Sequence, residues 1–454
     1  MGGIFKAYDV RGIYPTEIDE ATARSIGRAF RSVLDDDDFE HGGDTVVVSR
    51  DMRPSSGPLS EALVDGLTEA GLDVVDIGLA TTPMNYFAIG RLRAAGGIQV
   101  TASHNPAKYN GLKFSKHEAR PVSGDHGIPL LERKVAAGDL PTAARRGSVR
   151  TADVVDEYRR HVLSFLRRPA HARRLRVVVD AANGMATTDL PIFEAMGIDL
   201  VPLYFDLDGT FPNHEANPLK LENLRDLQTK VVECGADLGV SCDGDFDRGA
   251  FVDERGSPIG SDLVTGLIAG ELLGREPGKH VVYDLRSSRA VPEYIREQGG
   301  VPVRERVGHS FMKATLRAKH GIFGGELAGH YYFRDNYYAD CAVMAMIEVL
   351  NLLWESDQPM SELVAPLERY AKSQETNFEV DDKLGTMKRL EADYADGRVD
   401  WLDGITVEYD DWWFNVRASN TEPLLRLVCE ARSGPMLERR MAELTAKIGT
   451  PVHH

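Results

Sequence analysis

Three stretches decide the fold of this 454-residue chain: TVVVSRDMRPSS (residues 45–56), RVVVDAANGMA (176–186) and HVVYDLRSSRA (280–290). Each begins with apolar, mostly β-branched residues and then passes into a polar turn. This pattern is typical of a buried strand that leads through a loop into a helix. A single occurrence would mean little, but two further apolar stretches follow each of the three in the same order.

The second stretches are AGLDVVDIG (70–78), MGIDLVPLYF (196–205) and QGGVPVRERVGHS (298–310). The third stretches are GGIQVTASHNP (96–106), ADLGVSCDGDFDR (236–248) and GIFGGELAGH (321–330). The ordered recurrence predicts three related α/β domains with mixed sheets. A chain of this length also needs several domains to bury its apolar residues.

The repeated pattern stops near residue 370. The rest contains three strand-like runs separated by polar turns, ITVEY (405–409), WWFNVRAS (412–419) and LLRLVCEA (424–431), and then an amphipathic helix near 435–448. These features predict a smaller, fourth α+β domain. We expect domains over residues 1–150, 151–255, 256–370 and 371–454, arranged around a central cleft.

Composition narrows the classes of protein. Apolar residues make up 43% and charged residues 27%, which is typical of a folded, water-soluble chain. The net charge of −17 disfavours nucleic acid and anionic membranes as partners, and it requires any phosphorylated substrate to be bound by local cations. Neither an apolar run of ~20 residues nor a signal-peptide pattern is present, so we expect a cytoplasmic protein without membrane partners.

In open α/β sheets, ligands bind beyond the carboxyl ends of the strands, so the loops after the third strands are the candidate site. The first, TASHNPAKYNGLKFS, offers Ser103 as a nucleophile, with His104 beside it and Lys113 further on. Serine is a weak nucleophile unless neighbouring groups activate it. Taken alone, S-H-N-P is also an ordinary turn.

The second loop places Asp243, Asp245 and Asp247 at alternate positions, a density of hard oxygen ligands that suits Mg²⁺ or Ca²⁺. An EF-hand is a rival interpretation, because Glu254 falls at the twelfth position of such a loop. Arg248 stands where its sharp turn needs glycine, and the flanking sequences are strand-like. A solvated acidic turn is the remaining alternative.

Two more loops carry functional groups. The third pairs Glu326 with His330 among glycines that let a ligand approach the backbone. The fourth, RASNTEP, combines a guanidinium, two hydroxyls and an amide that could hold a phosphate without a metal; its residues are Arg417, Ser419, Asn420 and Thr421.

Together these motifs resemble the α-D-phosphohexomutase superfamily, and most closely its phosphomannomutase and phosphomannomutase/phosphoglucomutase branch. The resemblance runs from Tyr8-Asp-Val-Arg11-Gly12 through TASHNP with YNGLK, DGDFDR and RASNTEP, and so covers nearly the whole chain. It implies that Ser103 is the phosphoserine. It also implies a Mg²⁺ ion held by Asp243, Asp245, Asp247 and a phosphate oxygen on Ser103.

The resemblance implies roles for the other residues too. Arg11, Lys113 and His330 would stabilise charge and transfer protons near the phosphoryl group, with Arg248 close by. Glu326 would read the 3- and 4-hydroxyls of the hexose, and the Gly308-His309 turn would contact substrate. Arg417, Ser419, Asn420 and Thr421 would grip the phosphate that is not transferred.

The reaction so implied interconverts mannose 6-phosphate and mannose 1-phosphate through a hexose 1,6-bisphosphate, which is both intermediate and activator. A phosphoglucomutase or dual-specificity enzyme is the alternative. A phosphoglucosamine mutase is less favoured because residue 327 is Leu rather than Gln. Ala328 replaces the serine usual in the family's sugar loop, which weakens inference about the sugar. We expect small hexose phosphates as partners and a monomer or homodimer.

Two other classes remain as alternatives. A metal-dependent phosphohydrolase would use similar carboxylates, but it has no need of a second phosphate loop, and residue 247 is Asp where the D-x-D-x-T motif needs Thr. A calcium-binding structural protein would leave Ser103 and RASNTEP without a purpose.

Overall fold

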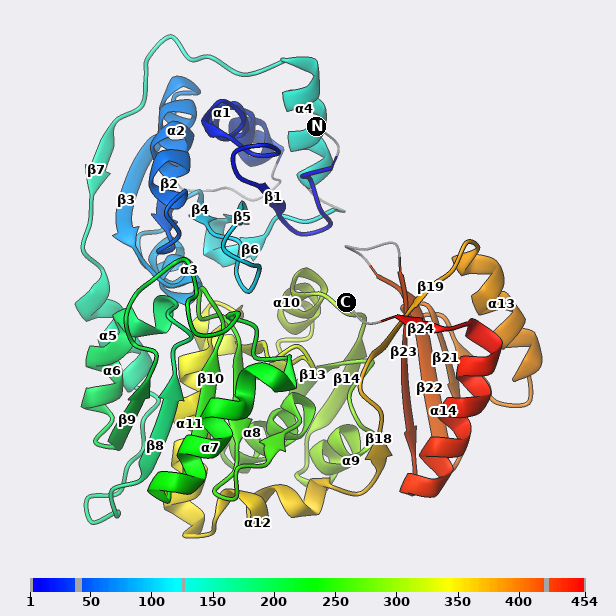
Figure 1. Ribbon diagram of the computed structural model, residues 1–454. Coiled ribbons are helices and arrows are strands. Elements are labelled where there is room, and N and C mark those ends of the chain that lie inside the picture. Colours follow the sequence, from blue (N-terminus) through cyan, green and yellow to red (C-terminus); the bar gives the residue numbers. More distant parts are fainter. Residues whose placement is uncertain (1–2, 37–42, 125–126, 420–423, 453–454) are drawn as a thin grey trace.

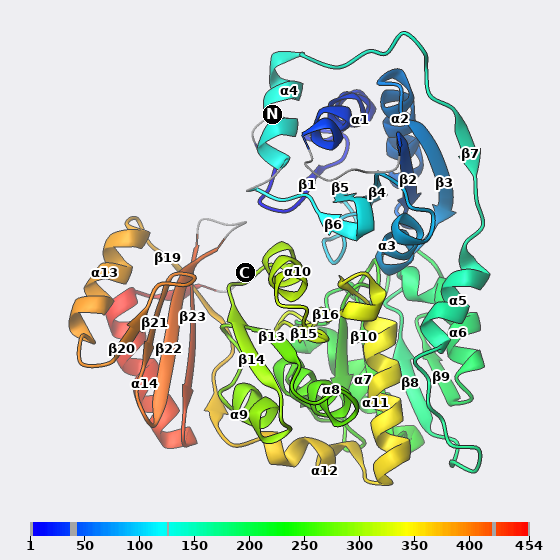
Figure 2. The same cartoon turned by 180° about the vertical axis from the view of Figure 1, so that it is seen from behind.

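The computed structural model describes residues 3–36, 43–124, 127–419 and 424–452 of the chain. They form four domains, each built around one β-sheet, and the sheets follow one another along the sequence (Figure 1). Both views place the first domain above the second and third, with the fourth beside the third (Figures 1 and 2).

The first sheet has the order β1-β5-β4-β2-β3-β7, with β6 paired to β5. Strand β2, from TVVVSR, lies between β3 and β4 and is parallel to both. Strands β3 and β4 come from the sequences AGLDVVDIG and GGIQVTASHNP. The strands are β1 (Val10–Ile13), β2 (Thr45–Arg50), β3 (Asp73–Leu79), β4 (Gly96–Val100), β5 (Tyr109–Lys116), β6 (Arg120–Pro121) and β7 (Val149–Thr151).

Strand β5 differs from the expectation, which took the whole of TASHNPAKYNGLKFS as a loop. It pairs antiparallel with β4, and Lys113 is the register partner of Gln99. Lys113 therefore projects from a strand, and this fixes its position more firmly than a loop would.

The second and third sheets repeat the arrangement of the first. In each, the first strand lies between two parallel neighbours, and the third strand is followed by an antiparallel one. The second sheet comprises β8 (Arg176–Asp180), β9 (Asp199–Leu203), β10 (Leu238–Cys242), β11 (Gly249–Val252) and β12 (Pro258–Ile259). The third comprises β13 (His280–Asp284), β14 (Val301–Glu305), β15 (Phe323–Gly325), β16 (Tyr331–Phe333) and β17 (Ala339–Asp340).

Successive side chains of a strand point to opposite faces of its sheet, and helices cover both faces. Val46 and Val48 pack into a core with α1, α2 and α4, whereas Val47 faces α3 on the other side. The helices of the first three domains are α1 (Glu20–Asp35), α2 (Ser56–Glu69), α3 (Thr82–Arg91), α4 (Ile128–Ala137), α5 (Val155–Leu163), α6 (Leu190–Ala195), α7 (Arg225–Cys234), α8 (Ser261–Arg275), α9 (Ala290–Glu297), α10 (His309–Ala318), α11 (Ala342–Ser356) and α12 (Met360–Val364).

The fourth domain is an antiparallel sheet with two helices on one face (Figure 1). The α+β class and the C-terminal helix agree with the prediction, whereas the helix at residues 383–393 was not predicted. Its strand order is β20-β21-β22-β23-β19-β24, with β18 paired to β23. Its elements are β18 (Ala371–Lys372), β19 (Thr376–Glu379), α13 (Lys383–Asp393), β20 (Arg398–Asp400), β21 (Ile405–Glu408), β22 (Trp412–Ala418), β23 (Leu424–Ala431), α14 (Gly434–Ile448) and β24 (Pro451–Val452).

The apolar core is distributed unequally among the domains. One continuous cluster contains Val47 of the first domain, Val177 of the second and Val281 of the third. Most of the buried apolar residues described in the fourth domain form a cluster of their own, whereas Trp413, Leu424 and Val428 are buried outside it. Its contacts with the third domain include polar ones, such as that between Arg304 Nη1 and Glu408 Oε1 at 2.7 Å.

None of the helices in the described ranges combines the length and the apolar character needed to cross a membrane.

Helices α1 and α2 approach closely through two glycines. A Cβ added to Gly66 would lie 2.0 Å from the carbonyl oxygen of Arg24, and one added to Gly27 would lie 2.5 Å from that of Leu63. These are backbone atoms of the partner helix, so neither clash can be relieved by a change of rotamer.

We therefore expect Gly66→Ala to lower the free energy of unfolding by about 1–3 kcal/mol, because the helices must move apart. Gly57→Ala is the matched control in the same helix, where an added Cβ meets no atom within 4 Å. It should be neutral or stabilise by up to about 1 kcal/mol through higher helix propensity. Urea unfolding followed by circular dichroism measures both variants, and equal midpoints would contradict the packing argument.

Candidate active site

The site forms at the carboxyl ends of strands β4, β10 and β15, one from each of the first three sheets. Ser103 follows β4, the acidic loop 243–247 follows β10, and the loop from Glu326 to His330 follows β15. The carboxyl ends of these strands thus supply the three loops expected from the sequence.

Ser103 is fully buried at the centre of the site. Its hydroxyl donates a hydrogen bond to Asp243 Oδ2 at 2.7 Å, and its Oγ lies 3.3 Å from His104 Nδ1. Its φ is +51°, a left-handed conformation that is uncommon for residues other than glycine. Backbone strain of this kind persists only where the surroundings impose it, and it is frequent at functional sites.

Arg53 holds the serine loop in this conformation. Its side chain is buried, pairs with Asp51 at 3.1 Å, and donates to four carbonyl oxygens of the loop. The distances are 2.8 Å to Ser103, 2.6 Å to Asn105, 2.9 Å to Pro106 and 3.1 Å to Tyr109. Arg53 lies in TVVVSRDMRPSS (residues 45–56), but no motif around it predicts this role.

The three aspartates of the second loop lie together as expected. Asp243, Asp245 and Asp247 are buried, and one carboxylate oxygen from each lies within 4.8 Å of the others. Burial raises the pKa of Asp243 well above its usual value, and the negative charges of Asp247 and Asp245 raise it further. The cluster therefore needs positive charge close by.

Lys113 supplies some of that charge. Its Nζ lies 2.7 Å from Asp245 Oδ2 and also pairs with Asp247 Oδ2. Burial works against the charged lysine, but Asp245 and Asp247 outweigh it and raise the pKa of Lys113. The ammonium group thus offsets part of the negative charge of the carboxylates.

The donor set suits a divalent cation. The Oδ1 atoms of Asp245 and Asp247 are buried and have no hydrogen-bond partner among the described residues. Unpaired buried carboxylate oxygens of this kind are the hard ligands that Mg²⁺ and Ca²⁺ prefer. The loop joins the antiparallel strands β10 and β11 rather than two helices, and Glu254 hydrogen-bonds to Ser361 instead. These facts exclude the EF-hand.

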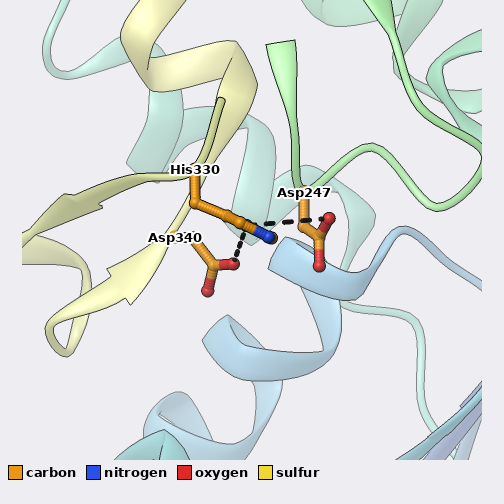
Figure 3. A group of neighbouring side chains, drawn as sticks. All are labelled: Asp247, His330 and Asp340. Atoms are coloured by element: carbon orange, nitrogen blue, oxygen red, sulfur yellow. Dashed lines mark ion pairs between the residues drawn. The ribbon is translucent and has the colours of Figure 1, made fainter. Parts of the chain in front are cut away.

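His330 is aligned by a neighbour that the sequence analysis did not find. Its Nδ1 lies 2.7 Å from Asp340 Oδ2 and 3.9 Å from Asp247 Oδ1, so that the imidazole stands between two carboxylates (Figure 3). Asp340 in turn lies 2.6 Å from the buried Nζ of Lys313. Burial alone would raise the pKa of Asp340, but Lys313 and His330 hold it well below its usual value. Asp340 has no motif around it that could have identified it.

Asp247, His330 and Asp340 also lie close enough to bind a metal. This group includes an imidazole, whereas the aspartate triplet offers carboxylates alone, the hard oxygen ligands that Mg²⁺ and Ca²⁺ prefer. The triplet is therefore the better site for such a cation.

Glu326 contacts the Gly308-His309 turn through the backbone of Gly308. The carboxylate of Glu326 accepts a hydrogen bond from Gly308 N–H at 2.9 Å and another from the hydroxyl of Tyr332. The ring of His309 packs edge-on against Tyr8 at 5.3 Å. A pocket of about 210 Å³ opens beside this turn, lined by Ala7, Tyr8, Gly124, Arg306, Val307, Phe311 and Asp403.

Two arginines complete the positive side of the site. Arg11 pairs with Asp9 at 2.5 Å and donates to Asn105 in the serine loop. Arg248 lies 3.9 Å from Asp243 through its Nε. Burial lowers the pKa of His104 well below its usual value, and the charges of Arg248 and Arg11 add to the effect. His104 is therefore a neutral imidazole beside Ser103.

The predicted phosphate loop is only partly described. Arg417 is buried at the end of β22 and donates to Glu375 Oε2 at 2.9 Å. The N–H of Ser419 donates to Leu424 O at 2.8 Å. Asn420 and Thr421 lie outside the described residues. Arg417 belongs to a cluster in the fourth domain, apart from the serine and the aspartates.

Comparison with known proteins bears on the whole chain. Four models of the phosphoglucomutase/phosphomannomutase family match in order: α/β/α domain I at residues 2–140, domain II at 156–256, domain III at 260–370 and the C-terminal domain at 375–447.

Individual relatives agree with these matches. A phosphohexose mutases protein of Xanthomonas campestris pv. campestris is 40% identical, with 97% of this chain and 98% of the relative covered. A phosphomannomutase of Salmonella montevideo is 38% identical, with 97% of both covered. The crystal structure of a phosphoglucomutase/phosphomannomutase family protein from Burkholderia thailandensis superposes with a TM-score of 0.90 at 36% identity, covering 100% of this chain and 99% of that one.

Fold, site and relatives together define a phosphohexomutase, an enzyme that transfers a phosphoryl group on hexose phosphates. The chain belongs to the phosphoglucomutase/phosphomannomutase family.

We expect Asp245→Asn to weaken Mg²⁺ binding about 10-fold or more, because it removes a charged hard ligand from the triplet. Isothermal titration of the full-length protein with MgCl₂ measures the effect. Glu61→Gln, which removes an exposed carboxylate on α2, is the control and should bind Mg²⁺ as the unchanged protein does. Equal Mg²⁺ affinity in Asp245→Asn would show that the triplet is not the metal site.

Proposed function

We propose that this enzyme is a phosphomannomutase that interconverts mannose 6-phosphate and mannose 1-phosphate through phosphorylated Ser103. The observation that carries the proposal is the 2.7 Å hydrogen bond from the Ser103 hydroxyl to Asp243, within a buried loop of three aspartates surrounded by cationic side chains. Phosphoryl transfer depends mainly on positioning and charge neutralisation, which this arrangement provides.

Asp243, Asp245 and Asp247 would hold Mg²⁺, which would offset negative charge on the phosphoryl oxygens when bound. Lys113, which contacts Asp245 and Asp247, brings a positive charge to the same place. Arg11 is held beside the serine loop through Asn105 and adds a second positive charge. Arg53 fixes the loop backbone so that Ser103 keeps its place throughout the reaction.

Proton transfer falls to His330. Its Nδ1 is directed at Asp340, so Nε2 is the nitrogen that meets the sugar hydroxyl. Asp340 keeps the ring in one orientation, as a carboxylate behind a catalytic imidazole does in hydrolases. His104 is neutral and close to Ser103 Oγ, and it shapes the serine environment without adding charge.

The reaction has two halves. Phosphoserine 103 gives its phosphoryl group to a hexose monophosphate, which becomes the 1,6-bisphosphate. That intermediate then presents its other phosphate to Ser103 and returns a phosphoryl group to it. Glu326 reads the 3- and 4-hydroxyls in both orientations, and Arg417, Ser419, Asn420 and Thr421 grip whichever phosphate is not being transferred. His309 and Arg248 contact the substrate between these two groups.

The preference for mannose rests on the relatives, among them the Salmonella montevideo phosphomannomutase. Glucose phosphates are the second candidate, since mannose and glucose share their 3- and 4-hydroxyls and Ala328 offers no hydroxyl to the sugar. Leu327 also lacks a polar group for an amino sugar, which places glucosamine phosphate last.

We expect Ser103→Ala to lower mutase activity by roughly three orders of magnitude or more, because the covalent route is lost. The same variant should lack the added mass of one phosphate that phosphatase treatment removes from the unchanged protein. Ser32→Ala, which alters a partly exposed serine on α1, is the control and should retain both activity and phosphate. Full activity in Ser103→Ala would refute the phosphoserine mechanism, and release of inorganic phosphate without isomerisation would indicate a phosphohydrolase.

We further expect kcat/KM to be greater for mannose 1-phosphate than for glucose 1-phosphate, and greater for glucose 1-phosphate than for glucosamine 1-phosphate. A coupled assay with the hexose 1,6-bisphosphate present measures all three under one set of conditions. A higher value for glucose 1-phosphate would replace the proposed substrate without affecting the proposed chemistry.

A further inference from the structure

Two arginines face each other in the sheet of the fourth domain. Arg417 on β22 and Arg426 on β23 are register partners in an antiparallel pair. Like charges directly opposite in a sheet repel each other and destabilise it. Glu375 lies between them, with Oε2 2.9 Å from Arg417 Nη2 and Oε1 3.1 Å from Arg426 Nη1. One carboxylate thus compensates both arginines.

Glu375 also reaches the third domain. Its Oε2 lies 3.5 Å from Arg286 Nη1, and Arg286 pairs with Asp284 at 2.8 Å. Asp284 accepts a hydrogen bond from Leu327 N–H at 2.7 Å, directly after Glu326. A continuous series of ion pairs and hydrogen bonds therefore joins the sugar loop to Arg417.

The backbone before Glu375 is attached to the fourth domain. Ala371 pairs with Ala431, and Ser373 exchanges two hydrogen bonds with Cys429, one at 2.8 Å and the other at 3.0 Å. The residue thus stands on the fourth domain while its side chain contacts both domains. It is placed at the junction where their relative position is set.

The charge of Glu375 is secure. Burial alone would raise its pKa, but Arg286, Arg417 and Arg426 outweigh burial and lower the pKa to about 2. The carboxylate occupies one nitrogen of Arg417, and the buried Nε of Arg417 has no hydrogen-bond partner among the described residues. That Nε is a donor left for an anion, and guanidinium forks bind phosphate in this way.

We propose that Glu375 is a positioning residue that fixes Arg417 at a set distance from Glu326, so that phosphate and sugar are bound at one spacing. The inference rests on the proposed function in one respect, namely that Arg417 binds the phosphate that is not transferred. A purely structural role for Glu375 would change stability but leave the affinity of the folded protein for hexose phosphate unchanged.

The test uses mannose 6-phosphate as a probe and the Ser103→Ala background, in which no phosphoryl transfer disturbs the titration. We expect Glu375→Gln to raise the Kd for mannose 6-phosphate about 10-fold, because a displaced binding group loses its alignment. With Ser103 intact, KM should rise in parallel while kcat at saturation changes less than about threefold, as for an interaction made equally in ground and transition states.

Two further variants make the result specific. Glu368→Gln removes an exposed carboxylate from the same linker and should leave the Kd unchanged. Glu375→Asp keeps the charge but is one methylene shorter, so its Kd should fall between those of the parent and Glu375→Gln. If Glu375→Gln does not fold, as a thermal unfolding scan would reveal, Glu375→Asp carries the test alone.

The outcomes separate the two proposals. Weaker binding in Arg417→Ala together with unchanged or tighter binding in the Glu375 variants would overturn the role of Glu375 and leave the phosphate grip standing. Unchanged binding in Arg417→Ala would overturn the phosphate grip, and the role of Glu375 would fall with it.

Discussion

The structure depends on the need to compensate three carboxylates buried in one loop. Asp243, Asp245 and Asp247 cannot all be ionised in a buried site unless cations approach them, since burial and mutual repulsion both oppose ionisation. Lys113 from the first domain adds positive charge beside Asp245 and Asp247, next to that of Arg248 from the second domain itself. The acidic loop is therefore an electrostatic reason for the first and second domains to assemble, and it lies beside Ser103.

The shared apolar core gives this electrostatic arrangement its geometry. Because Val47, Val177 and Val281 belong to one cluster, the three sheets cannot shift independently without opening the core. The loops that follow β4, β10 and β15 are therefore held at fixed positions relative to one another. Arg53 and Asp340 then refine it locally, one by holding the backbone around Ser103 and the other by aligning His330.

The sequence predicts those features of the fold and site whose residues lie close together in the chain. Apolar triplets followed by polar turns identify the parallel strands, and DGDFDR identifies the acidic cluster because its ligands are close in sequence. Strand β5 was not predicted from a local pattern, because its sequence YNGLKFSK directly follows a loop rich in polar groups. The contacts of three other residues could not be predicted for a different reason. Arg53, Asp340 and Glu375 each contact partners that are distant in the chain, and the local sequence around an isolated charged residue does not indicate such a contact. Asn420 and Thr421 lie outside the described residues, so their assignment still rests on the RASNTEP motif.

Because the fourth domain has a separate apolar core, its contacts with the third domain should depend on the salt concentration. The contacts by which it meets the third domain include the partly exposed ion pairs of Arg304 with Glu408 and Asp400, and no apolar cluster of the described residues is shared by the two domains. Attractions between partly exposed charges weaken as dissolved ions screen them, whereas apolar packing does not. Higher ionic strength therefore weakens these contacts of the fourth domain more than it weakens the apolar core that the first three domains share. Salt concentration is thus a variable that acts on the junction between the third and fourth domains.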